Sequence, residues 1–160
     1  MTALAHDYRT PRAWIALAVF LALVIGIGAL IGTQSVPGVW YESLTKPPLN
    51  PPNWVFGPVW FALYVMIAVA GWRIWIAAPA SSAMKFWGAQ MLLNWAWSPI
   101  WFLAQLPWVA FAVLVAMWLA ILGFILTGRC NDHIAPWLFA PYLAWVSFAG
   151  YLNLSIAILN

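Results

Sequence analysis

The stretch WYESLTKPPLNPPNW, residues 40–54, separates two long apolar segments and decides how this chain is divided into helices. It holds four prolines together with Glu42 and Lys46, in a chain where only 6% of the residues are charged. Proline fixes the backbone φ angle and lacks an N–H donor, so a proline-rich stretch ends helices and forms a loop. We therefore expect one long helix before this loop and another after it.

The overall composition is that of a membrane protein. Of the 160 residues, 66% are hydrophobic, and the mean hydropathy is +0.92, far above that of an ordinary soluble domain. A helix needs roughly 20 apolar residues to cross a bilayer, so a few crossings use up nearly the whole chain. The net charge of +3 comes from scattered basic residues and gives no nucleic-acid footprint. We expect a single transmembrane domain over residues 1–160, with the lipid bilayer as its surroundings.

Uncharged apolar runs and the polar breaks between them predict five helices. In lipid, only helices and closed barrels satisfy all backbone hydrogen bonds, and these runs lack the alternation of barrel strands. The predicted fold class is therefore all-α, an integral membrane bundle of five transmembrane helices. The expected helices cover about 13–33, 54–76, 85–103, 108–127 and 134–158, and the long loop covers 34–53.

The basic residues predict the orientation in the membrane. One end of the bundle holds five of the six Lys and Arg residues, and the other end holds only Lys46. By the positive-inside rule, the N-terminus lies in the cytoplasm, and the 34–53 loop lies on the opposite face. A bacterial inner membrane is the default expectation.

Fourteen tryptophans are the most unusual feature of the composition. Those near helix ends fit the aromatic belt at the bilayer surface, where the ring is partly buried and the N–H stays wet. Other tryptophans lie inside the predicted spans, on the same helical face as side-chain amides. Exposing an amide to lipid tails costs free energy, so these faces should point into the bundle. These inward faces combine Gln90, Asn94, Trp97 and Trp101, then Tyr142, Trp145, Ala149 and Asn153, and finally Trp60, Tyr64 and Ile67.

Large flat rings with a few neutral hydrogen-bonding groups are typical of a pocket for a flat, largely apolar ligand. The alternative is that the same groups only hold the helices together. No Asp, Glu or His lies inside a predicted span, which argues against ion-coupled pumping. The sequence shows no nucleophile–base pair and no cluster of metal ligands, so we expect no metal site, no required cofactor and no hydrolytic chemistry.

Three motifs stand out in the sequence: WYESLTKPPLNPPNWVFGPVW (residues 40–60), LLNWAWSP (92–99) and PYLAWVSFAGYLN (141–153). Together they resemble the TspO/MBR family of tryptophan-rich sensory or translocator proteins, and the resemblance extends in the same order from about Ala13 to Asn160. It implies a five-helix bundle, often a homodimer, that binds porphyrins and, in some members, sterols or synthetic ligands. The ligand-binding positions that it implies are Tyr41, Pro51, Trp60, Tyr64, Asn94, Trp97, Ser98, Trp145 and Ala149.

The resemblance also suggests what the proline-rich loop does. A loop with few N–H donors and little backbone freedom can be ordered over an apolar cavity, and we interpret residues 34–53 as such a lid. Glu42 and Lys46 lie four residues apart, so they can pair with each other, or Lys46 can meet a ligand's carboxylate. The sterol-recognition pattern requires a basic residue soon after a tyrosine, and none follows Tyr151.

The function that the resemblance implies is binding of porphyrins such as protoporphyrin IX, in sensing, scavenging or transport-linked regulation. One alternative is an enzyme that degrades porphyrin in light, with Trp60 and Trp145 as the redox-active pair. Another is a passive translocator of a tetrapyrrole or a sterol-like molecule. The family also occurs in outer membranes, so an outer membrane is the alternative location.

Overall fold

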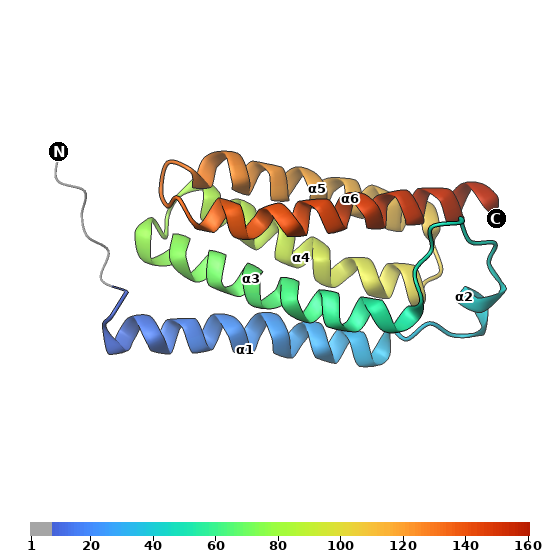
Figure 1. The fold of residues 1–160 in the computed structure, drawn as a ribbon, viewed down its shortest axis with the longest axis horizontal. Coiled ribbons are helices and arrows are strands. Elements are labelled where there is room, and N and C mark those ends of the chain that lie inside the picture. Colours follow the sequence, from blue (N-terminus) through green and yellow to red (C-terminus); the bar gives the residue numbers. More distant parts are fainter. Residues whose placement is uncertain (1–7) are drawn as a thin grey trace.

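The computed structural model describes residues 8–160 as an elongated bundle in which five long helices run side by side (Figure 1). No strand occurs in this part of the chain, so the predicted all-α class is confirmed. In chain order the elements are α1 (Pro11–Gln34), α2 (Val39–Ser43), the 3-10 turn η1 (Asn53–Val55), α3 (Phe56–Ala77), α4 (Ser82–Phe102), α5 (Pro107–Gly128) and α6 (Ala135–Leu159).

The number of helices differs from the prediction, because the loop contains the short helix α2. Residues 39–43 form a single helical turn between prolines, and a segment of that length is too short for hydrophobic periodicity to reveal. Among residues 8–160, four helical segments are long and apolar enough to cross a bilayer: α1, Asn53–Ala77, α5 and α6. The helix α4 does not reach that hydropathy, because it carries Lys85, Gln90 and Asn94.

The ends of the long helices follow from local chemistry. The hydroxyl of Thr10 accepts a hydrogen bond from the Ala13 N–H at 3.2 Å, and Pro11 occupies the first turn of α1, where a missing N–H costs nothing. Ser81 caps α4 in the same way, accepting from the Met84 N–H at 3.3 Å. The break before α5 is a tight turn in which Gln105 adopts a positive φ of 56°.

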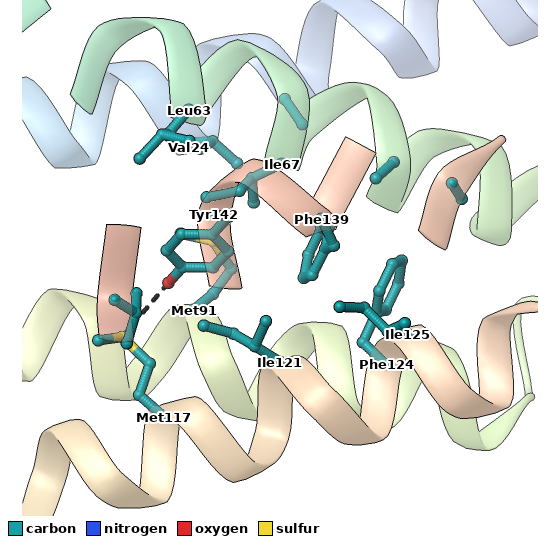
Figure 2. Packing of buried hydrophobic residues seen from close by; sticks show 14 of the residues in the cluster. Val24, Leu63, Ile67, Met91, Met117, Ile121, Phe124, Ile125, Phe139 and Tyr142 are labelled. Atoms are coloured by element: carbon teal, nitrogen blue, oxygen red, sulfur yellow. Dashed lines mark hydrogen bonds between the residues drawn. The ribbon is translucent and has the colours of Figure 1, made fainter. Parts of the chain in front are cut away.

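The core lies where α3, α4, α5 and α6 meet, while α1 covers one side of α3 and leaves most of its own surface exposed. Phe124 of α5 stacks on Phe139 of α6, with ring centroids 3.9 Å apart (Figure 2). Gly71 of α3 lies directly against the Trp87 ring of α4, where even a Cβ atom would clash. These close contacts hold α5 against α6 and α3 against α4, and Tyr142 of α6 is fully buried in the core (Figure 2).

An ion pair stabilises one end of the bundle. This end lies opposite to the loop that connects α1 to η1, which we call the 35–52 loop. Arg73 of α3 donates two hydrogen bonds to Asp132, which lies in the connection between α5 and α6, at 3.0 and 2.8 Å. Asp132 also accepts from the Ile134 and Ala135 N–H groups at the start of α6. Burial alone would raise the pKa of Asp132, but the Arg73 guanidinium and these backbone donors outweigh burial and lower the pKa to about 2.

Candidate functional site

A cavity of about 660 Å³ lies at the loop end of the bundle, bounded by α1, α3, α4, α6, Met117 of α5 and the 35–52 loop. Its wall is dominated by aromatic and aliphatic side chains, and among residues 8–160 no charged side chain lines it. Seven of the positions predicted to bind ligand lie on its wall: Tyr41, Trp60, Tyr64, Asn94, Trp97, Ser98 and Ala149.

The predicted positions Pro51 and Trp145 do not line this cavity. On α6 it is Ala149, one turn further along, that faces the space, while the Trp145 ring packs edge to face against Phe56 at 5.8 Å. Phe56 itself lines the cavity, so Trp145 contacts a ring of the wall without lining the space. Of the two tryptophans that an enzymatic role would use as a redox-active pair, Trp60 lines the cavity and Trp145 does not.

Several polar groups of the inward helix faces hydrogen-bond to one another. The Tyr64 hydroxyl donates to Asn94 Oδ1 at 3.2 Å, and Asn94 Nδ2 donates to the Tyr142 hydroxyl at 3.0 Å. Nearer the loop, the Trp97 indole donates to Asn153 Oδ1 at 3.2 Å. These hydrogen bonds join three helices, and Gln90, Asn94 and Asn153 are all buried, so the prediction that the amide faces point inward is confirmed.

The helix α1 supplies part of the wall that the sequence did not predict. Ile25, Ala29, Gly32 and Ser35 border the cavity, together with Gly28. Gly28 is packed so closely on the Tyr64 ring that a side chain there would overlap the ring. The segment GIGALIG, residues 26–32, carries a G-x-x-x-G spacing typical of a close helix approach, which by itself does not indicate a ligand-binding surface.

The loop covers the cavity through Tyr41, which is only 6% exposed and whose hydroxyl donates to Asn50 Oδ1 at 3.3 Å. Its ring packs edge to face on Phe102 of α4 at 5.6 Å. Burial raises the pKa of Tyr41, so this phenol stays neutral at physiological pH. The position of Tyr41 is thus fixed both by packing on α4 and by hydrogen bonding within the loop.

Lys46 does not form a carboxylate pair with Glu42. Its ammonium group lies 4.8 Å from the centre of the Tyr41 ring and donates to the backbone carbonyls of Glu42 and Leu44, both at 3.2 Å. A cation over an aromatic face is attracted by the ring quadrupole, so Lys46 also steadies Tyr41. The charge itself lies outside the cavity wall.

The loop is tied to the end of α6 by a two-way hydrogen bond. Thr45 N–H donates to Asn160 Oδ1 at 2.9 Å, and Asn160 Nδ2 donates back to the Thr45 carbonyl at 3.1 Å. A side-chain amide that pairs with both backbone groups of one residue mimics a strand partner. The arrangement can therefore enclose a flat apolar molecule beneath an ordered loop.

The cavity wall offers rings and neutral hydrogen-bonding groups rather than reactive ones. In the described part of the chain, no group of three or more His, Cys, Asp or Glu side chains is placed to hold a metal ion. The polar side chains on the wall are the amides, hydroxyls and indoles of residues such as Asn94, Ser98 and Trp97. Such groups orient a bound molecule through hydrogen bonds and ring contacts.

Comparison with known proteins agrees with this architecture. The sequence pattern of the TspO/MBR family matches residues 14–159. A tryptophan-rich sensory protein of Cereibacter sphaeroides is 35% identical over 147 residues, covering 92% of each chain. A tryptophan-rich protein TspO of Chlorobaculum tepidum is 33% identical over 150 residues, covering 91% of this chain and 95% of its own. The human translocator protein is 32% identical over 145 residues, covering 85% of each chain. The long apolar helices and these matches together show that the chain is a multi-pass integral membrane protein and belongs to the TspO/MBR family.

Proposed function

We propose that the cavity binds a tetrapyrrole or a similar flat, largely apolar molecule, and that the protein acts in sensing, scavenging or transport-linked regulation of that ligand. The observation that carries this proposal is the cavity of about 660 Å³, lined by aromatic rings and a few neutral polar groups. Pockets of this size and lining are typical of sites that bury most of a small ligand. The rings of Trp60, Tyr64 and Trp97 offer faces and edges against which a planar molecule can pack.

The wall favours a metal-free ring over a haem. Haem iron is usually held by His, Cys, Met or Tyr, and neither His nor Cys lies on the described wall. The two tyrosines of that wall, Tyr41 and Tyr64, donate their hydroxyl protons to Asn50 and Asn94, and Met117 is its single methionine. The Met117 sulfur lies 3.3 Å from the Tyr142 hydroxyl, as a second possible acceptor beside Gln90 Oε1 at 3.0 Å. Protoporphyrin IX, which carries no metal, is therefore the probe that fits the proposal.

The distribution of basic residues supports an N-terminus in the cytoplasm. Arg12, Lys85 and Arg129 lie at the end of the bundle opposite to the loop, and Lys46 lies at the loop end. The positive-inside rule then supports a topology with the loop on the side of the membrane opposite to the N-terminus, which is the outer face if the membrane is a bacterial inner membrane, our default proposal.

The test is a titration of the detergent-purified protein with protoporphyrin IX, followed by tryptophan fluorescence and by the porphyrin absorption band. We expect saturable binding at one site, weakened at least about tenfold, or about 1.4 kcal/mol, by Trp60→Leu. The matched control is Trp118→Leu, because Trp118 lies outside the cavity wall and hydrogen-bonds to Ser147. Quenching that never saturates, or equal weakening in both variants, would show that porphyrin merely partitions near the indoles.

A further inference from the structure

A continuous chain of hydrogen bonds leads from the cavity wall into the core. The Tyr64 hydroxyl donates to Asn94, and Asn94 donates to the Tyr142 hydroxyl. The Tyr142 hydroxyl in turn donates to Gln90 Oε1 at 3.0 Å. Tyr64 and Asn94 line the cavity, whereas Gln90 is 0% exposed and lies outside its wall. Three helices thus connect a cavity-facing phenol to a fully buried amide.

In this arrangement every group donates away from the cavity. The Tyr64 proton is committed to Asn94, so the Tyr64 oxygen is left with free lone pairs and can only accept from a molecule in the cavity. At the far end, Gln90 Nε2 is buried and has no hydrogen-bond partner. A buried N–H group without a partner is unfavourable, so this direction of the chain is not strongly preferred.

The same heavy atoms support the opposite direction. A half-turn of the two side-chain amides exchanges their nitrogen and oxygen atoms without moving either tyrosine. Gln90 then donates to Tyr142, Tyr142 donates to Asn94, and Asn94 donates to Tyr64. The group without a partner becomes the Gln90 carbonyl, and an unpaired carbonyl is better tolerated in proteins than an unpaired N–H. The Tyr64 proton is released and becomes a donor for the cavity.

We propose that the direction of these hydrogen bonds is reversible. In one direction Tyr64 accepts a hydrogen bond from a ligand, and in the other Tyr64 donates one to it. Gln90 is a positioning residue in this scheme, because it sets the direction of the chain without touching the ligand. The inference rests on the proposed function, since it assumes that flat molecules enter the cavity. A metal-free tetrapyrrole suits such a wall, because its centre carries both N–H groups and unprotonated nitrogens.

Three flat tricyclic probes of nearly the same shape separate the two directions. Carbazole carries an N–H donor, 9-fluorenone carries a carbonyl acceptor, and fluorene carries neither. We expect carbazole and fluorenone each to bind the unaltered protein about fivefold tighter than fluorene, the effect of one net hydrogen bond. Binding is measured by displacement of protoporphyrin IX and, independently, by quenching of tryptophan fluorescence.

Replacing Gln90 by Leu should fix the direction. The Tyr142 proton then keeps an oxygen partner only by donating to Asn94, because the Met117 sulfur is a weaker acceptor. Tyr64 is thereby held as a donor. In Gln90→Leu we expect carbazole to lose its fivefold advantage over fluorene while fluorenone keeps it, and Gln90→Met, of similar length, should behave alike. The control is Met91→Leu, because Met91 is buried next to Gln90 in the sequence but takes no part in this series of hydrogen bonds. This variant should still bind carbazole and fluorenone more tightly than fluorene.

The outcomes distinguish this inference from the proposed function. Equal loss of affinity for all three probes in Gln90→Leu would mean that Gln90 only supports the fold, and would overturn the inference. Saturable porphyrin binding without any difference among the probes in the unaltered protein would overturn it too, while leaving the proposed function intact. If neither porphyrin nor any probe binds saturably, the proposed function fails as well.

Discussion

Ala149→Phe is expected to abolish high-affinity porphyrin binding, lowering the affinity at least about a hundredfold, or about 2.7 kcal/mol. Ala149 lines the cavity from α6, opposite the aromatic wall that α3 and α4 provide. A phenylalanine ring at this position would occupy the space in which the ligand is proposed to lie. The measurement is the protoporphyrin IX titration carried out on the purified variant.

The matched control for this substitution is Ala144→Phe. Ala144 lies on the same helix but is exposed and is not part of the cavity wall. The added ring there should leave porphyrin affinity unchanged. Retained affinity in Ala149→Phe, in a variant whose helical content equals that of the unaltered protein, would place the ligand elsewhere.

Asp132→Ala is expected to lower the free energy of unfolding by about 2 to 4 kcal/mol. The substitution leaves the partly buried Arg73 without its counter-ion and removes the acceptor for the Ile134 and Ala135 N–H groups at the start of α6. The measurement is unfolding of the detergent-solubilised protein in a denaturant titration. Porphyrin affinity should change little in the folded fraction, because Asp132 lies at the end of the bundle away from the cavity.

The control Asp132→Asn keeps a side-chain oxygen for the helix start but removes the charge, so its cost should be about half as large. The pH dependence separates the two effects. The folded pKa of Asp132, about 2, lies below the ordinary value of an aspartate, so its contribution to stability is complete above about pH 4. This contribution should fall as the pH drops from about 4 to 2 in the unaltered protein, and should be absent in Asp132→Asn. Identical acid unfolding of the two proteins would contradict this assignment.

The long helices could be predicted because their signal is local. Uncharged apolar runs bounded by polar or proline-containing breaks placed their ends within three residues of those observed. The short helix α2 escaped prediction, because its five residues lie within a proline-rich loop and are held by contacts with α4, such as that between Tyr41 and Phe102. The low hydropathy of α4 reflects amides that become buried only when the bundle forms.

The cavity could be predicted only in part. Helical spacing correctly indicated that Gln90, Asn94 and Tyr142 face inward, because an amide inside a membrane bundle has few alternatives. Spacing could not show that the Trp145 ring packs on Phe56 and does not line the cavity, since this depends on how α3 and α6 pack. The contribution of α1 was missed for a related reason: Gly28, which packs on Tyr64, carries no side chain that would mark a binding surface.

The most direct test of the central claim is an experimental structure of the protein saturated with protoporphyrin IX. The account predicts density for a planar ring inside the cavity, between Trp60 and Ala149, below Tyr41 and within contact distance of Tyr64. Density for the porphyrin on the lipid-facing surface of the bundle, with the cavity free of it, would contradict the account.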